Sequence, residues 1–296
     1  MNSDQDSIQT LGQVPVLMPP VLPPVSPPSP LRPATTLDEV IANIDTVIEW
    51  SIAASSRLGY FAALYKRITV AVKTAVTDGF FENGPRLARL DVAFANRYFD
   101  AVNGYLHPDR FAKPTRSWRV SFDAAAREEP IMLQHMLAGV NAHIGLDLGI
   151  VAQAVDISTR DMKTDFDRIN AVLASQVSGI VTDIDELSPA LADVYAVLMK
   201  NEIFLIDEAV TNFRDDAWRF AKILAFEPGF VRPVTIRLRD LTVAGQGALI
   251  YDTPGLVGLI QSAINAVAAR ESRDIVHNIR VLDEIAATPA AISTSL

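Results

Sequence analysis

A histidine and an aspartate four residues apart are the side chains of this sequence best suited to chemistry. His143 and Asp147 lie in an almost wholly apolar stretch, residues 131–155, where a helix would bring both to one side. Such a pair can bind a divalent metal ion, here Zn, Fe or Mn, that activates water. Without a metal, the aspartate can orient the histidine as a general base, or the two can simply fix helix packing. The spacing leaves all three hypotheses open.

Further polar residues would need specific partners if they were buried. His135 is another catalytic candidate, although two helical turns, about 12 Å, would separate it from His143. A guanidinium such as that of Arg97 can bind an anionic group of a substrate, and aromatic rings can line an apolar pocket. The candidate substrate-binding residues are Asn141, Arg97, Tyr60 and Tyr98.

A metal site would need ligands beyond the histidine and aspartate pair. The chain has no cysteine and 4 histidines, so the additional ligands would be carboxylates from neighbouring helices. Acidic residues in suitable segments are Asp45, Glu49, Asp91, Asp161 and Asp165. From these we predict a metal site formed by His143, Asp147, Asp91 and Glu49.

Helical periodicity of the apolar residues runs through most of the chain after residue 35. Thr36 and Glu39 have the spacing of a capping box, so the first helix is expected to begin there. Further helices are predicted at about 59–78, 85–103, 118–128, 130–156, 160–186, 188–226, with a possible break, and 255–287. This pattern predicts an all-α fold with the helix of His143 buried at its centre.

Two parts of the chain depart from this pattern. Residues 227–254 are rich in Pro, Gly and β-branched side chains, which predicts a loop or a short β-hairpin near 234–251. Residues 1–35 are proline-rich and are expected to form a disordered tail, either a spacer or a ligand for a proline-binding module. The remainder, 36–296, is expected to fold as a single helical-bundle domain.

The overall composition restricts the class of function. Hydrophobic residues make up 49% of the chain, so it can bury a large core. A formal charge of -9 argues against a general nucleic-acid binder, which must neutralise phosphates. Polar residues interrupt the longest apolar stretches, and the N-terminus lacks the pattern of a secretory signal. We expect a cytoplasmic protein without a transmembrane segment, whose partner is a small-molecule or lipid-like ligand.

Several segments, taken in order, resemble a bacterial family classed as domain of unknown function 5995. Its N-A-H-I-x-x-D-L element is present from Asn141 to Leu148. The other similar segments are SRLGYFAALYKRIT at 56–69, RLDVAFANRY at 89–98, DFDRIN at 165–170 and AW at 217–218. The resemblance covers about residues 37–225 and implies an α-helical domain without an assigned reaction.

These observations favour an enzyme with a pocket beside the helix of His143 and Asp147. It would act on a small apolar substrate by metal-assisted chemistry, as in a hydrolase, or by histidine-based acid and base catalysis. The alternative is a non-catalytic helical module that binds a lipid-like ligand or a protein partner. The sequence does not identify a substrate.

Overall fold

The computed structural model describes residues 25–155, 160–183, 187–190, 207–252 and 259–291. All regular secondary structure in these residues is helical, with no strand, which confirms the predicted all-α fold. The elements are α1 (Leu37–Ala53), α2 (Leu58–Thr77), α3 (Gly84–Leu106), α4 (Arg116–Ala124), α5 (Met132–Ala142), the π-helical turn η1 (His143–Leu148), α6 (Gly149–Ala154), α7 (Arg160–Asp183), α9 (Asp207–Phe226), α10 (Arg232–Tyr251), α11 (Leu259–Ala268) and α12 (Ile275–Ala287).

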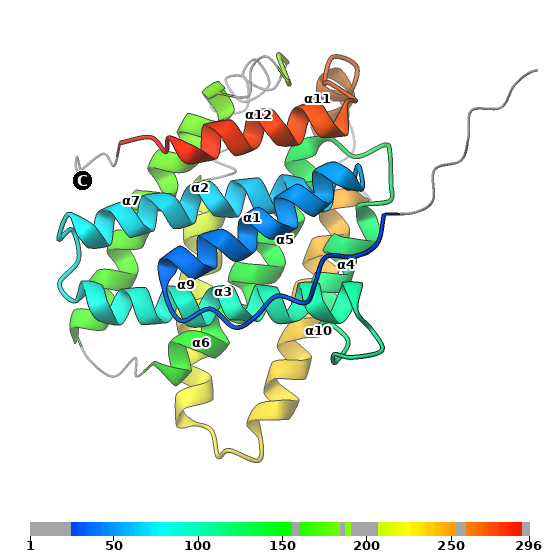
Figure 1. The fold of residues 1–296 in the computed structure, drawn as a ribbon. Helices are drawn as coiled ribbons and strands as arrows, with labels where there is room; N and C mark the ends of the chain where they lie inside the picture. The colour runs from blue at the N-terminus through cyan, green and yellow to red at the C-terminus, as the bar shows by residue number, and fades with distance from the viewer. Residues whose placement is uncertain (1–24, 156–159, 184–186, 191–206, 253–258, 292–296) are drawn as a thin grey trace, which may run out of the picture.

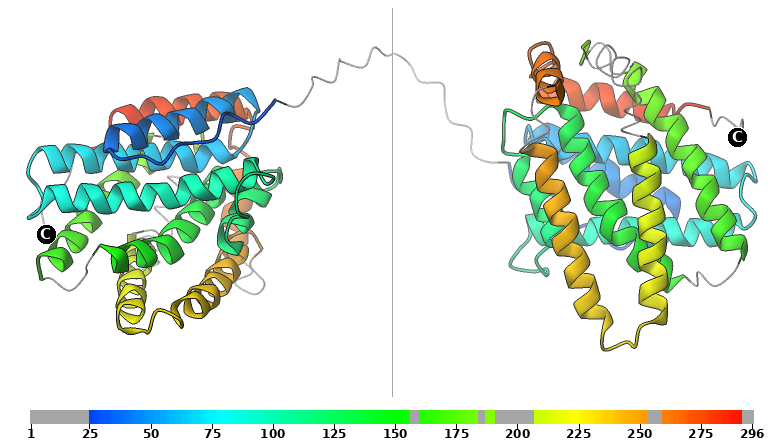
Figure 2. Two further views of the ribbon diagram at one scale, coloured as in Figure 1. Left: turned by 60° about the horizontal axis from the view of Figure 1, so that its bottom comes forward. Right: turned by 180° about the vertical axis from the view of Figure 1, so that it is seen from behind.

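Two buried helical elements organise the bundle. The first is α2, which contacts α1, α3, α5, α7 and α12. The second is the continuous run of α5, η1 and α6, which α9 and α10 flank on the side seen from behind in Figure 2. Almost every side chain from Ile131 to Ala152 is buried, as predicted for an apolar helix at the centre of a domain.

Side-chain caps fix where several helices begin. Thr36 caps α1 by accepting a hydrogen bond from the backbone N–H of Glu39, as predicted. The Glu39 carboxylate in turn accepts hydrogen bonds from the backbone N–H and the hydroxyl of Thr35. Asn83 caps α3 and Asp274 caps α12 in the same way, through the backbone N–H three residues later.

The prediction of a loop or β-hairpin near 234–251 is wrong, because α10 spans Arg232–Tyr251. Pro233 lies in the first turn of this helix, where a missing N–H costs nothing. One side of α10, including Val243 and Gly247, is buried against α4, α5 and η1. This packing outweighs the weak helix propensity of the β-branched residues and glycines.

Two other predicted boundaries are corrected. The single helix expected at 255–287 is interrupted, since α11 ends at Ala268 and Asp274 starts α12. The described part of the helix expected at 188–226 is helical only over α9, with residues 191–206 outside the described residues.

The last residues of the expected tail pack against the domain. The amide of Asn103 donates to the carbonyl oxygen of Leu31 and accepts from its N–H, both at 2.9 Å. Asn96 makes the same reciprocal pair with Ala34. Leu31 and Ala34 are buried, so the packed domain begins before residue 36. Residues 1–24 of the predicted tail lie outside the described residues.

Candidate functional site

The π-helical turn η1 places both residues of the predicted pair at the centre of the bundle. A π-turn widens a helix by one residue and is frequent at functional sites. Here it lies between α9 and α10, where a Cβ on Gly149 would come within 2.5 Å of the Phe220 ring. The absence of that side chain lets α9 approach closely, and this packing fixes the turn that carries His143 and Asp147.

The imidazole of His143 is enclosed by aromatic rings. It stacks on Phe94 with ring centroids 3.5 Å apart and an interplanar angle of 6°. Tyr65 meets it edge-on at 4.7 Å. More distant rings around it are those of Phe61, Tyr98 and Trp118. The ring is therefore held in one orientation by side chains from α2, α3 and α4.

Asp147 is fully buried and bound by residues other than the histidine. Its Oδ1 accepts from Nε of Arg97 at 3.0 Å and lies 2.9 Å from Nη2 of the same residue. Its Oδ2 accepts from the indole N–H of Trp118 at 2.7 Å. Burial opposes ionisation, but His143, Arg97 and Trp118 together hold the pKa of Asp147 below its ordinary value. Asp147 is therefore an anchored carboxylate.

His143 is aligned with this carboxylate but does not bind it directly. Its Nδ1 lies 3.7 Å from Oδ2 of Asp147, beyond hydrogen-bond distance. Within the described part of the chain, neither ring nitrogen of His143 has a hydrogen-bond partner. Burial lowers the pKa of His143, against the opposing effect of Asp147. The imidazole is therefore neutral at neutral pH and both of its nitrogens are available.

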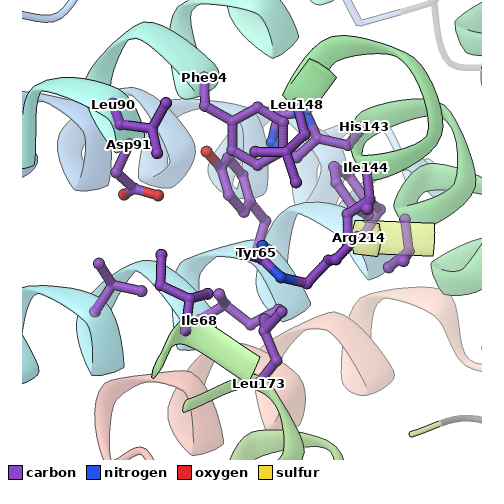
Figure 3. Close-up of a pocket in the computed structure, with 14 residues that line it drawn as sticks. Tyr65, Ile68, Leu90, Asp91, Phe94, His143, Ile144, Leu148, Leu173 and Arg214 are labelled. Atoms are coloured by element: carbon purple, nitrogen blue, oxygen red, sulfur yellow. The ribbon is translucent and has the colours of Figure 1, made fainter. Parts of the chain in front are cut away.

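An apolar cavity of about 50 Å³ adjoins His143 and is enclosed by α2, α3, α5, η1, α7 and α9. Figure 3 shows Tyr65, Asp91, Phe94 and His143 projecting toward it from different helices. The hydroxyl of Tyr65 and Oδ2 of Asp91 are buried, and neither finds a hydrogen-bond partner in the described structure. Three of the polar side chains on this otherwise apolar cavity thus have unsatisfied atoms.

The two charged side chains of the cavity differ in how well they are bound. Burial raises the pKa of Asp91 to about 7, while Arg214 acts in the opposite direction. Arg214 is itself bound, donating to the side-chain oxygen of Asn170 at 2.5 Å and to the carbonyl oxygen of Phe166 at 2.8 Å. Asp91 is therefore the carboxyl group that a ligand in the cavity would meet.

The structure does not bring the four predicted metal ligands together. Asp91 lines the cavity with His143, but Glu49 is exposed because the apolar face of α1 is the one turned inward. Both oxygens of Asp147 already accept hydrogen bonds. Over all the residues that the structure describes, no group of three or more His, Asp or Glu side chains could hold a metal ion.

His135 lies apart from the cavity, near Tyr60 and Tyr251, whose ring centroids are 5.9 and 5.7 Å from its own. Its Nε2 is buried without a hydrogen-bond partner. Burial, with Arg57 and Arg127 acting in the same direction, lowers the pKa of His135 to about 4. Two of the predicted catalytic residues, His135 and His143, thus occupy different surroundings.

The four predicted substrate-binding residues are not among those that line this cavity. Arg97 binds Asp147 and also borders a surface groove with Lys113. Asn141 donates to the carbonyl oxygen of Val243 at 2.9 Å and so ties α5 to α10. Tyr98 packs against Phe61 and Trp118, and Tyr60 adjoins His135.

Sequence reasoning missed Trp118 and Arg214. Trp118 stands near the start of α4 and Arg214 lies in α9, both far along the chain from the residues that they contact. Neither residue stands at a sequence interval from His143 or Asp147 that would indicate a contact. Only the packing of α4 and α9 against the central helix shows their part in the site.

Comparison with known proteins gives one match. The model of a family described as a family of unknown function (DUF5995) matches residues 37–253. The match extends past residue 225 and includes α10. No curated protein and no solved structure matches the chain.

Proposed function

This chain belongs to the DUF5995 family, and because that membership assigns no activity, we propose a function from the geometry of the cavity. The proposed function is acid and base catalysis on a small, largely apolar substrate that carries one polar group. The observation that carries it is the neutral imidazole of His143, with both nitrogens unpartnered, at a cavity shared with the carboxyl group of Asp91.

Unsatisfied polar atoms in an apolar cavity favour a ligand site. Leaving a buried polar atom without a hydrogen bond costs about 1 to 3 kcal/mol. A substrate that hydrogen-bonds to His143, Asp91 or the Tyr65 hydroxyl would recover this free energy. The apolar walls, which include Ile68 and Leu148, would exclude strongly hydrated molecules.

The arrangement around His143 suits a general base. With hydrogen on Nδ1, directed toward Asp147, the imidazole keeps the lone pair of Nε2 for accepting a proton from the substrate. The imidazolium ion that forms would be stabilised by the carboxylate at 3.7 Å. Arg97 and Trp118 hold that carboxylate in place, so they are positioning residues in this proposal.

Asp91 suits the role of general acid in the same reaction. A carboxyl group with a pKa of about 7 is partly protonated at neutral pH and can return a proton to the substrate. The two groups come from different elements, Asp91 from α3 and His143 from η1. The reaction class is therefore proton transfer within one substrate, as in an isomerisation: His143 removes a proton from carbon and Asp91 returns one at another position.

The size of the cavity limits the substrate. A volume of about 50 Å³ has room for about three to five water-sized groups. A short aliphatic or monocyclic molecule with a carbonyl or hydroxyl group would fit after a small displacement of the walls. Histidine-based chemistry is favoured over metal-assisted chemistry because Asp147 is occupied by Arg97 and Trp118.

The test is a ligand screen followed by hydrogen exchange. Small apolar molecules with one carbonyl, hydroxyl or carboxyl group would be screened against the full chain by ligand-observed NMR. Binders would then be incubated in D₂O with the protein, and uptake of deuterium at carbon would be measured. We expect the chain to catalyse exchange and the variant His143→Gln to bind the ligand but lose exchange by about 100-fold or more.

The matched control is His135→Gln, a second buried histidine of the central helix that does not line the cavity. It should leave exchange unchanged. Exchange that survives in His143→Gln would contradict the proposal. Binding without exchange in the unmodified chain would instead support a non-catalytic module for an apolar ligand.

A further inference from the structure

Apolar side chains are exposed where α9 turns into α10. In Figures 1 and 2 this turn projects from the body of the molecule. Phe226, the last residue of α9, is 89% exposed, and Phe230, in the turn itself, is 84% exposed. We call the exposed apolar residues here the α9–α10 tip; they are Ile223, Phe226, Phe230, Val234 and Leu238.

On each of the two helices, the exposed apolar residues of the tip lie on one side. On α10, Val234 and Leu238 are four residues apart and therefore share a side of the helix. On α9, Ile223 and Phe226 have the three-residue spacing that produces the same effect. Clusters of large exposed apolar side chains on a soluble protein mark surfaces that bind another molecule or a membrane.

The charge around the tip is opposite to that of the whole protein. The chain has a formal charge of -9, whereas residues 218–239 contain five basic residues and one acid, Glu227. The five basic residues are Arg219, Lys222, Arg232, Arg237 and Arg239. The tip therefore favours an anionic partner.

The contacts of these charged residues leave a positive outer surface. Glu227 is turned toward α10, where its Oε1 accepts from the hydroxyl of Thr235 at 3.0 Å and its Oε2 is buried. Lys222 and Arg237 are exposed. The other three are bound: Arg219 pairs with Asp216, Arg232 donates to the carbonyl oxygen of Glu227, and Arg239 donates to that of Gly145.

We propose that the α9–α10 tip docks on the surface of an anionic phospholipid bilayer. Phe226 and Phe230 would insert between the headgroups, and Lys222 and Arg237 would contact the lipid phosphates. Apolar residues combined with adjacent basic residues are what binding at such a surface requires. This inference does not depend on the reaction proposed for the cavity.

A second copy of the chain fits the tip less well. In a symmetric dimer the same patch meets itself, which would bring the basic side chains of both tips together. A projecting turn is also convex, whereas a stable interface needs two complementary surfaces of roughly 800 Å² each. An anionic bilayer accepts a small convex tip and attracts its positive charge.

The test is cosedimentation of the full chain with vesicles of phosphatidylcholine alone or with added phosphatidylserine. We expect binding to the anionic vesicles and a loss of about tenfold or more in Phe226→Ser/Phe230→Ser. Both side chains are almost fully exposed, so this variant should keep its circular dichroism spectrum and melting temperature. Phe226→Trp/Phe230→Trp should retain binding and show a blue-shifted emission on the vesicles.

Charge variants separate the electrostatic contribution. Lys222→Glu/Arg237→Glu should weaken binding about tenfold or more. The control Arg119→Glu/Arg280→Glu, at exposed arginines of α4 and α12, changes the net charge by the same amount and should not. Equal binding by the serine variant and the unmodified chain, or no binding to anionic vesicles, would overturn the proposal. A concentration-dependent dimer that the serine variant abolishes, without vesicle binding, would overturn it in favour of a second copy.

Discussion

The buried aspartates of the described residues fall into two groups. Asp165 and Asp240 each accept two backbone N–H groups at the starts of α3 and α4, and Asp147 accepts from Arg97 and Trp118. Asp91 is different, because one of its oxygens has no partner among the described residues. The first group stabilises the fold, whereas Asp91 reduces stability when it is ionised.

Asp91→Asn should therefore stabilise the protein in a pH-dependent manner. The pKa of Asp91 is raised in the folded state from its ordinary value of 3.8 to about 7. Its destabilising effect is thus absent below pH 4, grows as the pH rises, and is complete above pH 7. We expect a gain of about 2 to 4 kcal/mol in the free energy of unfolding at pH 8 and little gain at pH 4. Urea unfolding at both pH values measures this.

The asparagine variant also separates the two roles of Asp91. Under the proposed function, Asp91→Asn should no longer catalyse the uptake of deuterium by the ligand, although the variant is more stable. Asp165→Asn is the matched control, since it weakens a carboxylate that is already satisfied and should lower stability at pH 8. Equal stability of Asp91→Asn and the unmodified chain at pH 8 would show that the carboxyl group is not destabilising.

Asp147→Asn should have the opposite effect. The amide has the same size but no charge, so Arg97 loses its partner and an N–H₂ group faces one of the two bound donors. We expect a loss of about 2 kcal/mol or more in the free energy of unfolding, since the site is buried. Asp123→Asn, in an exposed pair with Arg119, should cost less than about 0.5 kcal/mol. Thermal unfolding of both variants compares them.

The pair of His143 and Asp147 shows how far sequence reasoning extends at the scale of residues. Four-residue spacing in an apolar stretch correctly predicted two buried polar groups facing each other. It did not reveal that Arg97 and Trp118 hold the carboxylate, because those residues reach it from α3 and α4. Contacts between distant segments have no periodicity in the sequence from which they could be read.

At the scale of elements, local sequence features correctly predicted where several helices begin. They did not predict that α10 is a helix. The cap at Thr36 and Pro85, in the first turn of α3, are local features, and both mark helix starts in the structure. In contrast, α10 has β-branched residues and glycines that favour other structures in isolation. Its helix is stabilised by packing on α4, α5 and η1, which the segment's own sequence does not specify.

Two helical glycines, Gly149 at the start of α6 and Gly245 on α10, should respond to alanine substitution in opposite ways. At Gly149 a Cβ would come 2.5 Å from Phe220 and 2.9 Å from the carbonyl oxygen of Ala217, so Gly149→Ala should cost about 1 to 3 kcal/mol. At Gly245, on the exposed side of α10, nothing lies within 4 Å. Gly245→Ala should stabilise the helix by about 0.5 to 1 kcal/mol.

Melting temperatures of the two alanine variants provide the measurement. The Gly149 variant should melt below the unmodified chain and the Gly245 variant above it. If Gly149→Ala were neutral, α9 and α6 would have to separate without loss, and the packing beside the π-helical turn would be less rigid than the contacts indicate.

At the scale of the whole molecule, residues 31–34, which precede α1, are part of the folded domain. Leu31 is 6% exposed, and the amides of Asn96 and Asn103 bind backbone groups of this segment. A chain that begins at residue 36 should therefore be less stable by about 2 kcal/mol or more, through lost apolar burial and unpaired amides. Denaturant unfolding measures the loss.

Leu31→Ala in the full chain is the matched comparison for this truncation. It removes most of the apolar contact but keeps the backbone pairs with Asn103, so it should produce an intermediate loss. Full stability of the chain that begins at residue 36 would show that the segment only rests on the surface. The proline content of residues 1–35 gave no indication of this contact, since the asparagines that make it lie on α3.

The fluorescence of Trp118 can report on the candidate site. Its N–H binds Asp147, and its ring centroid lies 5.7 Å from that of His143. Indole emission responds to nearby charge, so protonation of the imidazole or arrival of a ligand would alter the intensity from this one residue. The chain has only 3 tryptophans, and subtracting the spectrum of Trp118→Phe isolates its contribution. The protein thus carries its own unlabelled optical probe beside the residues proposed to react.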